Sequence, residues 1–142
     1  MVMSKPALSC VLLADRHHGL AEGVRGLLEP EFDTVVMVAD EASLFESAER
    51  LKPTVTVVDL SLARGEGLHW LPRLRARCPE MKLIVLSVYD QPNVSRLALE
   101  AGADGFVLKR AIATDLLAAI DAINVGQKYV SPGAGEGLPS TE

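Results

Sequence analysis

The sequence is poor in cysteine, in aromatic residues and in long apolar runs. Only 2 of its 142 residues are cysteines and 4% are aromatic, and the spacing of Cys10 and Cys78 is that of neither a metal site nor a disulfide framework. No apolar run approaches the roughly 20 residues that a membrane-spanning helix needs, and no secretory signal is recognisable near the N-terminus. These absences exclude a zinc finger, a disulfide-stabilised secreted domain and a membrane span, and they indicate a reduced, cytoplasmic protein with no membrane partner.

Positive charge is also scarce. The chain has 14 Lys and Arg against 19 Asp and Glu, a net charge of −5, which excludes a broad basic surface for direct nucleic-acid binding by this segment. A hydrophobic fraction of 49% and a charged fraction of 23% are typical of one folded domain of this length. We expect that domain to occupy residues 7–130, and we interpret residues 131–142, rich in Pro, Gly and Ser, as a linker or disordered tail.

Short apolar runs, nearly continuous and rich in β-branched residues, recur along the chain. The runs do not alternate with polar residues, which is typical of strands buried on both faces of a parallel sheet. The five runs cover residues 9–14, 35–39, 55–58, 83–88 and 105–108. The sequence therefore predicts a parallel sheet of five strands with helices on both of its faces.

Segments of helical period separate the apolar runs, with polar capping residues before them. The expected N-caps are Asp40, Asp90 and Thr114. The third helix is expected to begin near Leu68, so that Pro72 falls in its first turn, where proline is tolerated. Five βα units in succession predict a doubly wound α/β fold: a five-stranded parallel sheet flanked by five helices, flavodoxin-like, with strand order 2-1-3-4-5.

Four of the five expected strands deliver a polar residue to their carboxyl ends. These residues are Asp15, Asp59, Ser87 and Lys109. Each one alone is more often a turn former, a helix cap or a solvated charge than part of a site. In open α/β sheets, however, ligands bind beyond the carboxyl ends of the strands. Two carboxylates, a hydroxyl and an ammonium at this edge therefore favour a functional site.

Four motifs carry a resemblance to a known family. They are Val-Leu-Leu-Ala-Asp-Arg-His at 11–17, Val-Val-Asp-Leu-Ser at 57–61, Val-Leu-Ser-Val at 85–88 and Ala-Asp-Gly-Phe-Val-Leu-Lys at 103–109. In this order and spacing the chain resembles the receiver domain of two-component response regulators, over about residues 9–130. The resemblance is closest to the LuxR/NarL-like subfamily, whose receivers precede a helix-turn-helix DNA-binding domain.

The resemblance implies a phosphorylation site at Asp59. There a carboxylate would take a phosphoryl group from a sensor histidine kinase or a phosphotransfer protein, assisted by Ser87 and Lys109. The resemblance also implies Mg²⁺ as a cofactor, held by Asp15, Asp59 and the backbone carbonyl of Ser61. The protein would then be a signalling switch and not an enzyme, since its chemistry is limited to its own phosphorylation and dephosphorylation.

The resemblance further assigns the conformational switch to Ser87 and Phe106. The Ser87 hydroxyl would turn toward the phosphoryl group, and the space that it leaves would admit an inward rotamer of Phe106. This change would favour a homodimer and control an output, such as transcription, that these residues do not themselves encode.

Arg16 departs from the family pattern, which has a second acidic residue at this position. Its side chain can fold inward onto Asp15 or Asp59 or swing to solvent, and we favour the inward pose. An inward guanidinium would weaken Mg²⁺ binding, because it removes one ligand and adds like charge. Two alternatives stay open. One is a pseudo-receiver, which binds or dimerises without phosphorylation. The other is a flavodoxin-like enzyme with a flavin or another phosphate-bearing ligand, which the lack of a Ser/Thr/Gly-rich loop at 16–19 disfavours.

Overall fold

The protein is built on one parallel sheet of six strands. The computed structural model describes residues 9–62 and 68–134. The strands are β1 (Cys10–Ala14), β2 (Thr34–Val38), β3 (Val55–Asp59), β4 (Lys82–Ser87), β5 (Gly105–Leu108) and β6 (Tyr129–Val130), in the order β2-β1-β3-β4-β5-β6. Every residue of β3 and β5 is buried, as expected of strands covered on both faces. The predicted order of the first five strands is confirmed.

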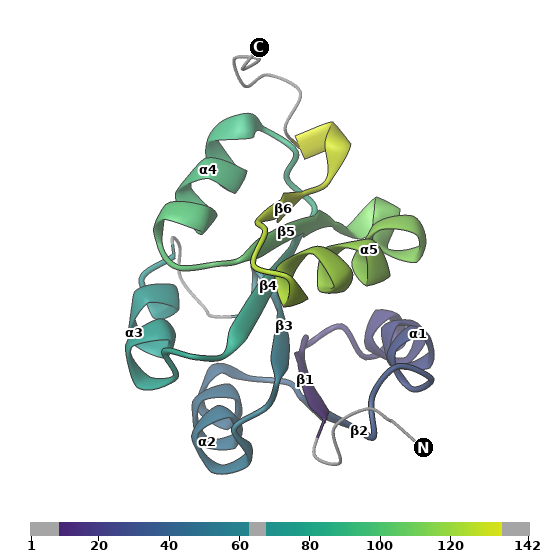
Figure 1. Cartoon of the computed structure of the whole chain (residues 1–142), viewed down its shortest axis with the longest axis vertical. Helices are drawn as coiled ribbons and strands as arrows, with labels where there is room; N and C mark the ends of the chain where they lie inside the picture. The colour runs from purple at the N-terminus through teal and green to yellow at the C-terminus, as the bar shows by residue number, and fades with distance from the viewer. Residues whose placement is uncertain (1–8, 63–67, 135–142) are drawn as a thin grey trace.

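The sixth strand corrects the prediction of a five-stranded sheet. Tyr129 and Val130 pair in parallel with Gly105 and Phe106 at the edge of the sheet, and Figure 1 shows β6 beside β5. Two residues are too few to form an apolar run, so only their pairing with β5 reveals this strand.

Residues 131–134, which we interpreted as the start of a linker or tail, pack against the sheet. The buried Ser131 hydroxyl accepts a hydrogen bond from the Leu108 N–H at 3.0 Å and donates one to the Asp115 carboxylate at 2.8 Å. Ala134 is also fully buried. The rest of that segment, residues 135–142, lies outside the described residues, and the domain boundary at residue 130 stays a prediction.

Five helices cover the two faces of the sheet. They are α1 (His18–Leu28), α2 (Glu41–Leu51), α3 (Trp70–Arg77), α4 (Pro92–Glu100) and α5 (Ile112–Asn124), with short 3₁₀ turns η1 (Lys109–Ala111) and η2 (Pro132–Ala134). Helices α1 and α5 lie on one face and α2, α3 and α4 on the other (Figure 1). Because side chains alternate along a strand, Leu12 belongs to the core under α2–α4 and Leu13 to the core under α1 and α5. Within the described ranges, none of these helices has the length and apolar character that spanning a bilayer requires.

Local sequence explains where α2 and α3 begin. Asp40 caps α2 as predicted, because its carboxylate accepts a hydrogen bond from the Ser43 N–H at 2.7 Å, and this bond lowers the pKa of Asp40. Helix α3 begins at Trp70, two residues later than expected. Pro72 still falls in its first turn, where the missing N–H costs no helical hydrogen bond.

Asp90 and Thr114 are not the helix caps that we expected. Gln91 is the N-cap of α4, and Asp90 forms an ion pair with Arg110 at 3.3 Å instead. Helix α5 begins at Ile112, because the chain after β5 already turns in η1 and leads directly into the helix. Thr114 therefore lies inside the first turn of α5 and not before it.

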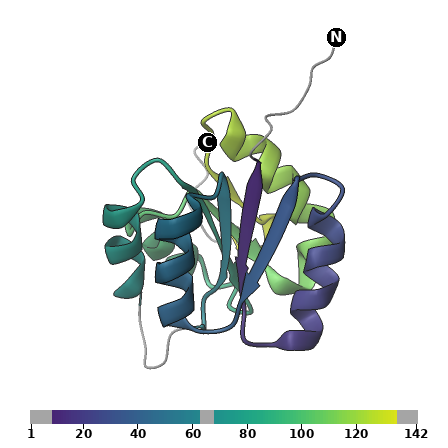
Figure 2. The same cartoon turned by 90° about the horizontal axis from the view of Figure 1, so that it is seen from below.

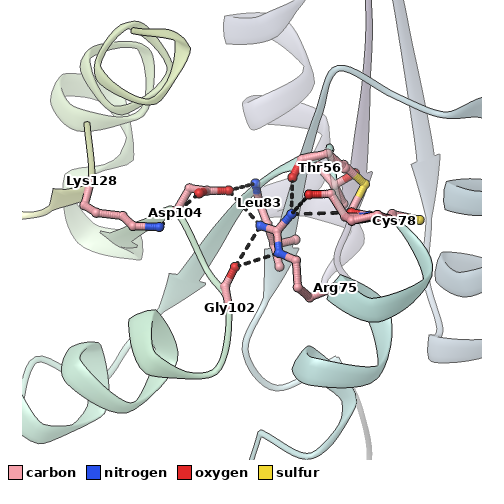
Figure 3. A network of polar contacts seen from close by, with 9 residues as sticks. Thr56, Arg75, Cys78, Leu83, Gly102, Asp104 and Lys128 are labelled. Carbon is pink, nitrogen blue, oxygen red and sulfur yellow. Dashed lines mark hydrogen bonds and ion pairs between the residues drawn. The ribbon is translucent and has the colours of Figure 1, made fainter. Parts of the chain in front are cut away.

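A network of charged groups joins four elements at the amino edge of the sheet (Figure 3). Asp104, directly before β5, accepts hydrogen bonds from the Leu83 N–H of β4 at 2.9 Å and from the Arg75 guanidinium of α3 at 2.8 Å. Lys128, directly before β6, forms an ion pair with Asp104 at 3.2 Å. Arg75 also donates to the Gly102 carbonyl at 3.1 and 2.7 Å. The network therefore holds α3, β4, β5 and β6 together.

Asp104 is charged in this network. Burial raises its pKa, but the hydrogen bond from Leu83 and the charges of Lys128 and Arg75 lower it by more, so that the pKa of Asp104 lies below its ordinary value. A carboxylate with a depressed pKa in the folded state stabilises the fold above its unfolded pKa of about 4. That stabilisation is lost as the pH falls through the folded-state pKa.

We predict that Asp104→Asn lowers the free energy of unfolding by about 1–3 kcal/mol at pH 7, because the amide loses the charge-assisted bonds to Arg75 and Lys128. Urea denaturation measures this loss, and the difference from the parent should shrink as the pH falls below about 4, where the unfolded chain takes up a proton at Asp104 before the folded chain does. Asp121→Asn is the matched control, since Asp121 is exposed and forms no hydrogen bond or ion pair within the described residues. Equal losses in the two variants would contradict the prediction.

Candidate functional site

The polar residues predicted from the strand ends lie at the carboxyl edge of the sheet. All strand pairings are parallel, so the strands end at one edge, and Figure 2 shows the arrows of β1 and β2 pointing in the same direction. Asp15 directly follows β1, Asp59 ends β3, Ser87 ends β4 and Lys109 directly follows β5. The topology alone therefore brings these four residues to one side of the molecule.

A buried carboxylate pair lies beside one ammonium group. Lys109 Nζ is 3.2 Å from Asp59 Oδ1 and 3.5 Å from Asp15 Oδ2. The side chains of Lys109, Asp59 and Asp15 are only 10%, 3% and 0% exposed, so the two carboxylates need a compensating charge. Lys109 therefore contacts both carboxylates of this edge, Asp59 and Asp15.

His17 completes the site, and sequence reasoning missed it. Its Nδ1 lies 3.1 Å from Asp15 Oδ1 and 3.4 Å from Asp59 Oδ2, and its backbone N–H donates to Asp15 Oδ1 at 2.8 Å. The ring is about half exposed, so it lies on the solvent side of the two carboxylates. One signal could have indicated this contact: an Asp side chain commonly accepts a hydrogen bond from the backbone two residues later, which brings His17 next to Asp15.

Arg16 does not fold inward, and that prediction is wrong. The residue is exposed and forms no hydrogen bond or ion pair with any residue that the structure describes. Arg16 lies at a bend between Asp15 and His17, and its side chain is turned to solvent while both of its neighbours face the site. Lys109 and His17 lie beside the carboxylates in its place.

The other predicted residues surround Asp59 in different ways. The Ser61 hydroxyl donates to Asp59 Oδ2 at 2.8 Å, and the role of its backbone carbonyl as a metal ligand stays a prediction. The buried Ser87 hydroxyl accepts a hydrogen bond from the Tyr89 N–H at 2.8 Å, and in the described part of the chain no hydrogen bond joins it to Asp59. Phe106 is fully buried within β5. Ser61 therefore touches the carboxylate directly, whereas Ser87 is bonded to its own loop.

The family model of the response regulator receiver domain matches residues 11–121 of the chain. The chain therefore belongs to the response regulator receiver domain family, and the parallel sheet with its acidic edge agrees with this membership. Phosphorylation on an aspartate is general for this family, and response regulators interact with histidine kinases.

Two curated relatives are longer regulatory proteins. The chain is 31% identical over 124 residues to the transcriptional regulatory protein DegU of Brevibacillus brevis, an alignment that covers 86% of this chain and 52% of DegU. It is 30% identical over 123 residues to the oxygen regulatory protein NreC of Staphylococcus haemolyticus, which covers 84% of this chain and 57% of NreC. The chain thus spans about half the length of these curated relatives.

Solved structures of response regulators share the fold. The RcsB response regulator of Salmonella typhimurium superposes with a TM-score of 0.81 at 27% identity, covering 90% of this chain and 65% of that chain. A LuxR-family two-component response regulator from Aurantimonas sp. SI85-9A1 superposes with a TM-score of 0.82 at 26% identity, covering 92% and 94% of the two chains. The resemblance to receivers of the LuxR/NarL-like subfamily is confirmed by these relatives.

The site fits a divalent cation. One ligand atom from each of Asp15, His17 and Asp59 lies within 4.8 Å of the others, and the buried Asp15 Oδ2, which is 3.5 Å from Lys109 Nζ, accepts no hydrogen bond from the described part of the chain. Receiver domains bind Mg²⁺ at acidic residues, and here Asp15 and Asp59 supply the carboxylates. A bound ion would provide positive charge against an incoming phosphoryl group.

We predict that Lys109→Met lowers the free energy of unfolding by about 3–5 kcal/mol at pH 7, because it leaves two buried carboxylates without their cation. Arg16→Met removes the same charge from an exposed position and should change stability by less than about 0.5 kcal/mol. Urea denaturation of both variants compares the two effects. Similar losses in both variants would show that Lys109 does not neutralise the pair.

Proposed function

We propose that Asp59 is the phospho-acceptor of this receiver domain and that a sensor histidine kinase or a phosphotransfer protein is the donor. The observation that carries the proposal is the buried Asp59 carboxylate, which lies 3.2 Å from the Lys109 ammonium and accepts a hydrogen bond from the Ser61 hydroxyl at 2.8 Å. Membership of a family that is phosphorylated on aspartate supports the same assignment.

The proposed transfer is a displacement at phosphorus. An oxygen of the Asp59 carboxylate attacks, the bond between phosphorus and the donor imidazole nitrogen breaks, and its electron pair stays with that nitrogen, so that an acyl phosphate forms. Lys109 lies where its ammonium can pair with the phosphoryl oxygens. A divalent ion, when bound, supplies the additional positive charge. Because the product is the modified protein itself, the chain acts as a switch and not as a turnover enzyme.

The proposed conformational response runs from Ser87 through Phe106 to the edge strand β6. Ser87 is bonded to the loop after β4 through the Tyr89 N–H, so a rotation of its hydroxyl toward a phosphoryl group would release that loop. Phe106 pairs with Val130 of β6, and its carbonyl accepts a hydrogen bond from the Ser131 N–H at 2.8 Å. A movement of Phe106 would therefore act on β6 and on the residues that follow it.

The relatives support an output in transcription and a dimeric active form. DegU is a transcriptional regulatory protein, and one solved structure contains two RcsB dimers bound to two parallel DNAs. We infer that the phosphorylated chain forms a homodimer and that DNA is bound outside this segment, whose net charge of −5 offers no broad basic surface. A cytoplasmic location is typical of response regulators and is part of the proposal.

A pseudo-receiver is the second candidate function, and Arg16 is the observation that favours it. The residue replaces the second acid of the family pattern, so the site has one carboxylate fewer with which to hold Mg²⁺. A chain that binds or dimerises without phosphorylation would not need that carboxylate. The intact Asp59 and Lys109 pair opposes this candidate, because a buried carboxylate pair is costly to retain without a use for it.

Intact-mass spectrometry distinguishes the two candidates. With acetyl phosphate and Mg²⁺, and in a parallel sample with Mn²⁺, the parent should gain one phosphoryl group and Asp59→Asn should gain none. Asp90→Asn is the matched control, since Asp90 is exposed and follows β4 at the same edge of the sheet, and it should keep the adduct. No adduct on the parent with either ion would favour the pseudo-receiver, and an adduct on Asp59→Asn would refute the assignment of the acceptor.

We predict that Ser87→Ala still accepts a phosphoryl group on Asp59. The conformational change at β6 should be much weaker in this variant, because the hydroxyl that would contact the phosphoryl oxygens is missing. Amide hydrogen exchange of Tyr129 and Val130 in β6 provides the measurement. Exchange should change on phosphorylation in the parent and change by much less in Ser87→Ala. An identical change in both proteins would show that the signal does not pass through Ser87.

A further inference from the structure

We propose that His17 is a metal ligand of this site and that it shifts the preference of the site from Mg²⁺ toward divalent first-row transition ions. This inference takes one assumption from the proposed function, namely that a divalent cation binds beside Asp59. The contacts of the His17 ring carry it.

The two carboxylates divide their oxygens between Lys109 and His17. Lys109 Nζ contacts Asp15 Oδ2 and Asp59 Oδ1, whereas His17 Nδ1 contacts Asp15 Oδ1 and Asp59 Oδ2. A cation on the His17 side would therefore meet one oxygen of each carboxylate. Lys109 Nζ also lies 3.5 Å from His17 Nδ1, so Lys109 would keep the other two oxygens while its ammonium moves away from the bound ion.

The spacing on the His17 side is that of a coordination shell. Two ligand atoms at right angles around an ion, with bonds of about 2.1 Å, are about 3.0 Å apart. His17 Nδ1 lies 3.1 and 3.4 Å from the two carboxylate oxygens, and the three ligand atoms all lie within 4.8 Å of one another. In this position Nδ1 can donate a proton to the carboxylates, accept a hydrogen bond from Lys109 Nζ at 3.5 Å, or bind a metal ion. The exposed part of the ring leaves the site open to ions from solvent.

The donor set decides which ion this site prefers. Mg²⁺ is a hard ion that selects oxygen ligands and gives up its water reluctantly, whereas an imidazole nitrogen suits Ni²⁺, Zn²⁺, Cu²⁺ and Fe²⁺. The exposed Arg16 stands where the family pattern has a second acid, so the site has one oxygen ligand fewer. His17 supplies a nitrogen in its stead, and the resulting set of two carboxylates and one imidazole is suited to a transition ion.

Isothermal titration calorimetry of the untagged, unphosphorylated protein with MgCl₂ and with NiCl₂ tests the inference. Ni²⁺ binds more tightly than Mg²⁺ at most sites that contain a nitrogen ligand. The test is therefore how much each affinity changes when His17 is replaced, and not the ratio of the two affinities in the parent. His17→Ala should weaken Ni²⁺ binding by at least about tenfold, because even the loss of a group that only supports a metal ligand costs about that much. The same variant should change Mg²⁺ affinity by less than about twofold. His18→Ala is the matched control, because His18 is 84% exposed and its ion-pair partner is Glu22; neither affinity should change.

A second variant, His17→Asp, replaces the nitrogen with oxygen and should raise Mg²⁺ affinity while lowering Ni²⁺ affinity. Unchanged Ni²⁺ binding in His17→Ala, an equal loss of both ions, or no Ni²⁺ binding by the parent would each overturn the inference. These measurements need no phosphoryl transfer. A phosphoryl adduct on Asp59 together with Ni²⁺ binding that does not depend on His17 would refute this inference and leave the proposed function intact. Ni²⁺ binding that depends on His17, without a phosphoryl adduct, would support this inference and contradict the proposed function.

Discussion

The contact between Lys109 and two buried carboxylates is the interaction on which the site depends. Asp15, Asp59 and Lys109 come from the ends of three strands, β1, β3 and β5, so their contacts exist only when these strands are assembled in their parallel order. The same assembly withdraws the carboxylates from water, which makes a neutralising cation necessary. Formation of the charged site therefore depends on formation of the sheet.

The inner part of the fold was predictable because burial on both faces leaves a clear trace in the sequence. Residues 55–58 are uniformly apolar or β-branched because helices cover both sides of β3. Strand β6 lies at the edge and has two residues, so its existence depends on its pairing with β5 and not on its own composition. The start of α5 was wrong for a related reason: residues 109–111 turn in η1, and a 3₁₀ turn has no hydrophobic pattern that separates it from a loop.

The site was predictable where the sheet positions a residue and unpredictable where a loop does. Asp59 and Lys109 were found because the carboxyl ends of parallel strands share an edge. Arg16 and His17 lie in the loop after β1, where the path of the backbone sets the direction of each side chain. Electrostatic attraction to Asp15 favoured an inward Arg16, but the backbone directs its neighbour His17 to the carboxylates instead. A charge argument without the backbone direction therefore selected the wrong residue.

Strand β5 connects the Asp104 network at the amino edge of the sheet with the Lys109–Asp59 contact at the carboxyl edge. Asp104 precedes this four-residue strand and is held by Arg75, while Lys109 follows it and contacts Asp59. A phosphoryl group on Asp59 would alter the charge at the Lys109 end alone, because Asp104 lies at the opposite edge with cations of its own. Phe106 sits between the two ends, bonded through its backbone to the segment that follows β6. The Arg75 network, which has no part in the chemistry, restrains β5 at Asp104, so a displacement would involve the residues beyond that point, from Phe106 to Lys109, and strand β6, which pairs with Phe106.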